Sequence, residues 1–354
     1  MFKKLLIFLV SVCVLVGAGT GLWVWQGLQT LEQPIALENS RILTVEPGTG
    51  FGQLALQLEA EGYVEDALWL RLYAKLNPGK AAIKAGDYEL QPGMTPVAMI
   101  DAMVAGDVKH WAVQFIEGKT FADMRATLAA TEHLEKRTTN WSDERIMAAI
   151  GAEGRHPEGL FYPDTYLFTS NETDLGILQR SYDRMASVLE EEWPQREQGL
   201  PYDSPYEALI MASIVERETG VASERAEVAG VFVRRLQKGM RLQTDPTVIY
   251  GMGDAYDGRI RSRDLRTHTP YNTYRIDGLP PTPIAMPGQA AIHAALHPAE
   301  GDALYFVARG DGSHKFSSTL AEHQRAVREF QLNRREDYRS SPAPTTDESG
   351  EGQD

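Results

Sequence analysis

Two glutamates, Glu216 and Glu218, stand at the end of an apolar segment that covers residues 204–220. Apolar residues fall on nearly every side of this segment when it is wound as a helix, which is typical of a helix in a protein core. A carboxylate at the edge of such a core is harder to ionise, so its pKa rises toward the range that a general acid needs near neutral pH. Helical spacing puts both side chains between apolar neighbours and does not choose between them. In the alternative interpretation both are solvated charges, with Arg217 neutralising one of them.

The ends of this segment carry helix signals. Ser204 can act as the N-cap, Pro205 suits the first helical position, and Glu207 completes a capping box. Gly220 stands where a helix often ends in the left-handed conformation. We therefore predict one helix that holds the two glutamates in its last turn.

Polar and aromatic side chains follow in later segments. Residues 243–245 supply amide, hydroxyl and carboxylate groups of the kind that orient a sugar, although local capping by Asp245 alone is an alternative. Residues 271–274 add hydrogen-bonding groups beside aromatic faces, and His314 follows a turn between two strand-like segments. Prolines stiffen residues 278–288, which could form a wall of a groove. The predicted substrate-binding residues are Gln243, Thr244, Asp245, Tyr250, Tyr271, Asn272, Thr273, Tyr274 and His314.

Long sequence blocks are spread over the chain in a fixed order. They are E-G-L-F-Y-P-D-T-Y (158–166), A-S-I-V-E-R-E-T-G (212–220), R-L-Q-T-D-P-T-V-I-Y-G (241–251), Y-N-T-Y-R-I-D-G-L-P-P-T-P-I-A-M-P-G (271–288) and Y-F-V-A-R-G-D-G-S-H-K-F (305–316). Together they resemble the endolytic murein transglycosylases, the YceG-like family. In that family the first glutamate of the I-V-E-x-E-T block is catalytic, and this position aligns with Glu216 rather than Glu218.

The resemblance implies a membrane-anchored lyase that cuts peptidoglycan strands between N-acetylmuramic acid and N-acetylglucosamine, leaves 1,6-anhydro ends and terminates strand elongation. Glu216 would be its single acid and base, without a cofactor. The implied partners are peptidoglycan strands and the inner membrane, with peptidoglycan synthases as further candidates. Two alternatives remain open: a non-enzymatic cell-wall scaffold that binds glycan, and a lysozyme-like hydrolase. Serine-hydrolase chemistry is not indicated, because G-x-S-x-G is absent from the sequence.

Composition narrows the other possibilities. The net charge of −14 and the pI near 5.1 argue against nucleic acid as a partner, since phosphate binding needs a basic face. The single cysteine, Cys13, excludes an intramolecular disulfide framework and a cysteine-based zinc site. His293 and His297 have the spacing of a metal pair on a helix, but the sequence offers no H-E-x-x-H motif and no evident third ligand. We therefore predict no metal site.

The N-terminus predicts a membrane anchor. Residues 1–4 are short and basic, and residues 5–25 are uncharged, mostly apolar and long enough to span a bilayer. Lys3 and Lys4 place the N-terminus in the cytoplasm and the catalytic domain in the periplasm. A cleaved signal peptide is the alternative, but no convincing cleavage site follows.

The rest of the chain reads as an α+β protein. After a connector (26–41), residues 42–108 have a β-α-α-β order that resembles a LysM-like module, a glycan-binding fold that members of the family carry. Residues 109–150 are expected to be a mainly helical joining segment, and residues 151–338 a helix-rich catalytic domain with short strands. The acidic tail, residues 339–354, lacks apolar periodicity and is predicted to be disordered.

Overall fold

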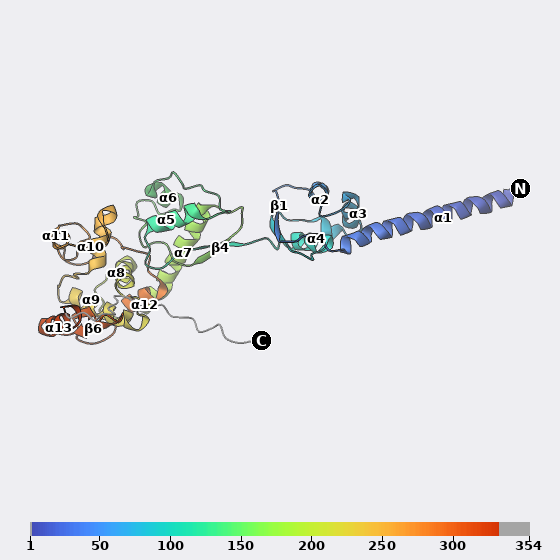
Figure 1. The fold of residues 1–354 in the computed structure, drawn as a ribbon. Helices are drawn as coiled ribbons and strands as arrows, with labels where there is room; N and C mark the ends of the chain where they lie inside the picture. The colour runs from blue at the N-terminus through green and yellow to red at the C-terminus, as the bar shows by residue number, and fades with distance from the viewer. Residues whose placement is uncertain (1, 333–354) are drawn as a thin grey trace, which may run out of the picture. The chain divides into compact units, whose positions relative to one another are not determined.

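The computed structural model describes residues 2–332 (Figure 1). The chain divides into two compact units. The first consists of the residues up to Ala112 with two short additions, 133–135 and 167–172, and the second of the other described residues. About half of the chain is helical and the strands form two-stranded sheets, so the mixed α+β class is confirmed. The predicted tail, residues 339–354, lies outside the described residues.

The first unit begins with a long apolar helix, α1 (Phe2–Gln29), followed by a short 3-10 turn (Thr30–Glu32). Within residues 2–332 it is the one helix long and apolar enough to cross a membrane (Figure 1). Its large apolar side chains are exposed. Exposed apolar surface of this extent is unfavourable in water and favourable in lipid. The predicted N-terminal apolar helix is therefore present, and it is longer than residues 5–25.

The remainder of the first unit has the predicted strand–helix–helix–strand order. The two strands are antiparallel, with Arg41 opposite Leu90 and Val45 opposite Gly86. Asp66 caps the helix that begins at Ala67, and Thr95 caps the helix that begins at Pro96, each by accepting a backbone N–H. The elements are β1 (Arg41–Val45), α2 (Phe51–Ala60), α3 (Ala67–Leu76), a 3-10 turn (Pro78–Ala81), β2 (Gly86–Leu90) and α4 (Pro96–Ala105). Their apolar faces enclose one core, which includes Leu43, Leu54, Leu58, Leu70, Tyr88 and Ile100.

The predicted joining segment, residues 109–150, is less helical than expected. It holds strand β3 (Trp111–Gln114), which pairs with β4 (Thr165–Phe168), and two helices, α5 (Phe121–Ala130) and α6 (Asp143–Ala149). The expectation of a mainly helical segment was wrong because side chain–backbone bonds hold the chain between α5 and α6 in an irregular loop. Asp174 accepts the N–H groups of Arg137 and Thr138 at 2.9 and 3.0 Å and the Thr138 hydroxyl at 2.7 Å.

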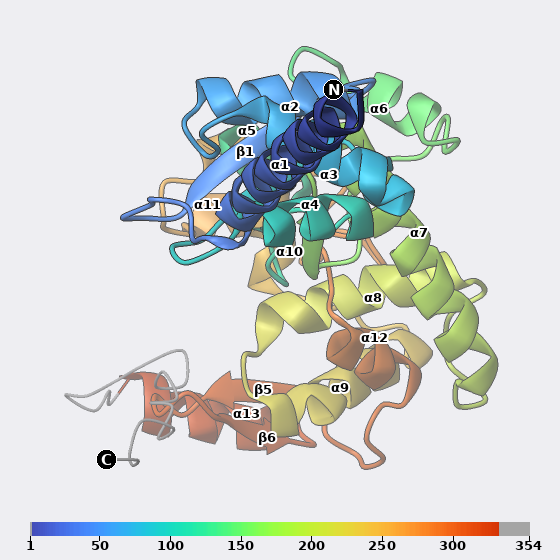
Figure 2. The ribbon, with the colours of Figure 1, turned by 90° about the vertical axis from the view of Figure 1, so that its right-hand side faces the viewer.

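In the second unit, α8 (Pro205–Glu218) is the central helix. Every residue from Ala208 to Val215 is buried, as the sequence predicts for a core helix. It packs against α9 (Arg225–Gln237), α10 (Asp245–Met252) and α12 (Gln289–Leu296), and Figure 2 shows α9 and α12 beside it. The other elements are α7 (Asp174–Glu192), α11 (Ser262–Arg266), the antiparallel pair β5 (Tyr305–Ala308) and β6 (His314–Ser317), α13 (Leu320–Val327), a π-helical turn (Arg328–Leu332), and 3-10 turns at Trp193–Gln195, Ala222–Glu224 and Gly253–Ala255.

The two ends of α8 differ from the prediction in detail. Ser204 caps the helix by accepting the Glu207 N–H at 3.3 Å, but Glu207 accepts the N–H of Asp203 rather than that of Ser204. Gly220 was expected to end the helix in the left-handed conformation, and this was wrong. The helix ends instead at Thr219, whose backbone is extended with φ −137°. The Thr219 hydroxyl accepts the Val221 N–H at 3.0 Å, so a side chain terminates the helix.

Candidate active site

Glu216 lies in the last turn of α8, half-buried, and faces the beginning of α12. Its Oε2 accepts the backbone N–H of Gly288, the N-cap residue of α12, at 3.1 Å. Burial raises the pKa of Glu216, and the nearby charge of Glu117 raises it further. The Gly288 N–H and the charges of Arg225 and Arg217 oppose this shift, but the net direction is upward. Glu216 is therefore a carboxyl group that holds its proton at a higher pH than an exposed glutamate and can release and regain it.

Two backbone segments meet beside Glu216. Gly118 donates to the carbonyl of Met286 and Met286 donates to the carbonyl of Lys119, both at 2.8 Å. Arg217 closes the arrangement by donating to the Gly118 carbonyl at 2.9 Å. These bonds bring residues 117–119 next to the loop that leads into α12, more than a hundred residues later in the chain.

This pairing adds a carboxylate that the sequence did not single out. A Cβ atom placed on Gly288 would lie 1.8 Å from Oε1 of Glu117, so the Glu117 side chain lies directly against the N-cap that holds Glu216. The strand–turn–helix pattern around residues 113–121 was visible in the sequence. Nothing in that pattern indicates which later segment it contacts.

Glu158 is a buried carboxyl group that the sequence analysis also missed. It is only 4% exposed, and it accepts the Phe121 N–H and the Tyr250 hydroxyl, both at 3.1 Å. Burial raises its pKa to about 7, because these hydrogen bonds offset the desolvation of the charge only in part. Its block, residues 158–166, was noticed for its aromatic residues, and the glutamate at its start was the available signal.

Glu218 points to a different part of the second unit. Its Oε2 accepts the Thr244 hydroxyl at 2.7 Å, and burial raises its pKa, with the charge of Asp245 acting in the same direction. It lines a pocket of about 560 Å³. The predicted substrate-binding residues in the lining of this pocket are Gln243, Asp245, Tyr274 and His314.

Direct contacts order the polar side chains of this pocket. Tyr274 donates to Oδ1 of Asp245 at 2.8 Å. His314 stands at the start of β6, where its N–H donates to Glu224 at 3.0 Å and its Nδ1 lies 2.7 Å from the other oxygen of Glu224. Gln243 holds a left-handed backbone with φ 52°, which is uncommon for a residue with a side chain. These are groups that can hydrogen-bond a polar ligand from several sides.

The other predicted residues lie outside the lining of this pocket. Tyr250 packs edge-on against Tyr271 with ring centroids 4.8 Å apart, and the Tyr271 hydroxyl lies 2.9 Å from that of Thr282. Both tyrosines therefore belong to the surroundings of Glu158, which Tyr250 contacts directly.

Asn272 and Thr273 are buried and tie their own loop together. The Asn272 amide donates to the carbonyls of Asp264, Leu265 and Thr267, and its oxygen accepts the Tyr274 N–H at 3.0 Å. The Thr273 hydroxyl accepts the N–H of Thr244 at 3.1 Å. Thr244 is itself buried and bonded to Glu218. Sugar binding by these three residues stays a prediction, and their geometry favours a role in positioning the loops.

Comparison with known proteins identifies the family. Residues 43–329 match the model of the YceG-like family. The chain belongs to this family. The resemblance seen in the sequence blocks is thereby confirmed, and it extends over both compact units.

This YceG-like protein is similar to named bacterial proteins and to a solved structure. It is 30% identical over 321 residues to a protein of Bacillus subtilis named endolytic murein transglycosylase, covering 85% of this chain and 88% of the relative. It is 26% identical over 340 residues to a protein of the same name from Streptococcus pneumoniae, covering 84% of this chain and 60% of that longer relative. A crystal structure of a YceG-like protein from Listeria monocytogenes is 28% identical, covers 82% of this chain and 99% of its own, and superposes with a TM-score of 0.48.

Proposed function

We propose that this YceG-like protein is an endolytic lytic transglycosylase of peptidoglycan and that Glu216 is its catalytic acid and base. The observation that carries the proposal is the environment of Glu216: a half-buried carboxyl group of raised pKa, fixed by the Gly288 N–H at the start of α12. A general acid near neutral pH needs such a pKa. The names of the relatives supply the substrate class, murein.

One carboxyl group suffices when the nucleophile belongs to the substrate. Glu216 first donates its proton to the oxygen between N-acetylmuramic acid and N-acetylglucosamine, and the bond from C1 to that oxygen breaks. The resulting carboxylate then takes the proton of the muramyl C6 hydroxyl as its oxygen bonds to C1. This attack is intramolecular and has the advantage of a tethered reactant. Glu216 regains its proton, no water is consumed, and the product is a 1,6-anhydromuramyl end.

The pocket beside Glu218 supports binding of a polar chain such as a glycan. Amide, carboxylate, phenol and imidazole groups line it together with the rings of Tyr305 and Phe306. Sugars combine hydroxyl edges with apolar faces, which such a lining matches. We assign Gln243, Asp245, Tyr274 and His314 to this role.

The N-terminal parts fit an enzyme held at the membrane. Helix α1 would cross the inner membrane once, with Lys3 and Lys4 in the cytoplasm and the catalytic domain in the periplasm. The strand–helix–helix–strand part of the first unit would be a LysM-like module that holds the enzyme on its glycan. An enzyme so placed would cut nascent strands close to peptidoglycan synthases and end their elongation. A reporter fused to the C-terminus tests this orientation. We expect a reporter enzyme that works only in the periplasm to be active there. Activity of a reporter that works only in the cytoplasm would refute the orientation.

Replacement of Glu216 by Gln tests the catalytic assignment. The amide is nearly isosteric but cannot donate the proton, and positioned acid–base catalysis contributes about 10²–10⁴ in rate. We therefore expect cleavage of purified peptidoglycan strands to fall by at least a hundredfold, with an unchanged unfolding temperature. Glu218→Gln is the matched control in the same helical turn, and its loss should be much smaller. A loss below tenfold for Glu216→Gln would contradict the assignment, and a wild-type protein that binds strands without cleaving them would support the scaffold alternative.

A further inference from the structure

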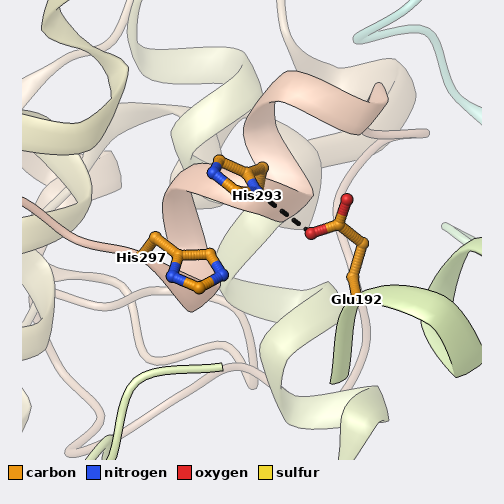
Figure 3. A group of neighbouring side chains, drawn as sticks. All are labelled: Glu192, His293 and His297. Carbon is orange, nitrogen blue, oxygen red and sulfur yellow. Dashed lines mark hydrogen bonds and ion pairs between the residues drawn. The ribbon is translucent and has the colours of Figure 1, made fainter. Parts of the chain in front are cut away.

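Three potential metal ligands meet where α7 and α12 end. Glu192 is the last residue of α7, His293 lies in the last turns of α12, and His297 is the C-cap residue of α12. Nδ1 of His293 lies 3.0 Å from Oε2 of Glu192, and the two imidazole rings are stacked with centroids 4.4 Å apart. Figure 3 shows the carboxylate directed at His293, and it shows His297 on the same side of the helix. The sequence analysis predicted no metal because it found no third ligand near the two histidines, and the fold supplies one from 101 residues earlier in the chain.

We propose that Glu192, His293 and His297 form a binding site for a divalent transition-metal ion, with zinc as the reference ion. One potential ligand atom from each residue lies within 4.8 Å of the other two. Zinc bonds to histidine nitrogen and carboxylate oxygen at about 2.0–2.2 Å, which places tetrahedral ligand atoms roughly 3.4 Å apart. Oε2 of Glu192 and Nδ1 of His293 already lie 3.0 Å apart, so the ligand atom of His297 is the one that has to move, by about an ångström. A movement of this size is within reach of side-chain rotation, since His293 is exposed and Glu192 and His297 are only half-buried.

The chemistry of the donor set selects the class of ion. Two imidazole nitrogens and one carboxylate oxygen suit zinc, nickel or copper, whereas magnesium and calcium prefer oxygen donors alone. Three protein ligands leave one position of a tetrahedral site for water, which is possible here because His293 is exposed.

Two neighbouring features favour a cation at this place. The site adjoins the C-terminal end of α12, where the unpaired carbonyl groups attract positive charge. The Gln289 amide donates to Oε1 of Glu192 at 3.3 Å and so leaves Oε2 directed at the histidines. A hydrogen bond that orients a ligating carboxylate is a usual part of metal sites. A simple surface pair of Glu192 and His293 would not require His297 to stack beside them.

The ion would hold α7 and α12 together at their C-terminal ends. The opposite end of α12 begins at Gly288, whose N–H binds Glu216, so the site would fix the helix that positions the proposed catalytic residue. The metal would thus stabilise the fold of the second unit without taking part in the reaction. This proposal does not depend on the proposed function.

A metal-binding titration tests the proposal. It uses the full-length protein in detergent, which is purified without a histidine tag and freed of metal with a chelator. We expect one equivalent of Zn²⁺ per chain in a competition titration against a chromophoric chelator, and an unfolding temperature that rises with zinc concentration. Co²⁺ in place of Zn²⁺ should show the visible absorption of a site with nitrogen and oxygen ligands. His293→Ala and His297→Ala should each weaken zinc binding at least tenfold and abolish the rise in unfolding temperature.

His268→Ala is the matched control, because it also removes an exposed histidine of the second unit. It should leave the affinity for zinc unchanged. The variants' unfolding temperatures in chelator should equal that of the wild type, which separates loss of binding from loss of folding. Absence of stoichiometric binding would overturn the proposal, and so would zinc binding that survives both His293→Ala and His297→Ala. If either variant fails to fold, Glu192→Gln replaces it, because this change keeps the size of the side chain. Zinc binding at least tenfold weaker in Glu192→Gln would support the proposal, and unchanged binding would overturn it.

Discussion

Replacing Glu158 by Gln should remove a large part of the pH dependence of stability. Glu158 is 4% exposed and accepts the Phe121 N–H and the Tyr250 hydroxyl, both at 3.1 Å. Glutamine can keep both contacts, since its carbonyl oxygen accepts the first and its amide donates to the oxygen of the tyrosine. The substitution therefore removes the titration while it preserves the packing.

The size of the effect follows from the raised pKa of Glu158. Its ordinary value is 4.5, and in the folded protein it is about 7. Between these two values the folded protein holds a proton that the unfolded chain has lost, so stability is full below pH 4.5 and falls as the pH rises toward 7. At about 1.36 kcal/mol per pKa unit, the wild type should lose about 3 kcal/mol across this window.

Urea unfolding of both proteins, followed by tryptophan fluorescence from pH about 4 to about 8, measures this loss. Other titrating groups, including Glu216 and Glu218, contribute equally to both proteins and cancel in the difference. We expect the free energy of unfolding of Glu158→Gln to rise by about 3 kcal/mol relative to that of the wild type as the pH rises through the window. Above the window the difference between the two proteins should stay constant. A difference that does not change with pH would refute the reasoning.

Two further predictions concern the backbone and the electrostatics of the site. Gly159 has φ +78°, and a Cβ there would lie 2.3 Å from a proline ring, whereas Gly154 has the same φ with open space around it. Gly159→Ala should therefore cost about 3 kcal/mol and Gly154→Ala about 1 kcal/mol in urea unfolding, and equal costs would contradict the close packing. Glu117→Gln removes a charge that raises the pKa of Glu216, so the fall of kcat/KM at high pH should move to lower pH, and an unmoved or upward-shifted profile would show that Glu117 does not act on Glu216.

Local signals in the sequence were sufficient for most elements of the fold. The N-cap at Ser204, the apolar run of α8 and the β5–β6 hairpin follow from neighbouring residues, and the structure has them. The predicted end of α8 at a left-handed Gly220 was wrong. Two ways of ending the helix compete there, a left-handed glycine and a hydrogen bond to the Thr219 hydroxyl. The burial of Thr219 in the folded protein favours the second. The loop between α5 and α6 depends on Asp174, which lies too far along the chain to be inferred from local pattern.

The candidate site also combines features that local sequence predicts with contacts that it does not. Glu216 could be named from its helix and its motif, and the contacts that set its pKa could not. Glu117 and Gly288 reach it through backbone pairing between distant segments. Of the predicted polar residues, four line the pocket at Glu218, and Tyr250 and Tyr271 lie around Glu158, which belongs to a segment outside α8. No spacing rule within one segment predicts that separation.

The masses of the released fragments test the central proposal most directly. Purified peptidoglycan strands are digested with the full-length protein, and the ends of the products are analysed by mass spectrometry beside a Glu216→Gln digest. We predict muramic ends that are lighter than reducing ends by one water, produced by the wild type and absent with the variant. Reducing muramic ends as the main product would show that water attacks C1, and the protein would then be a hydrolase.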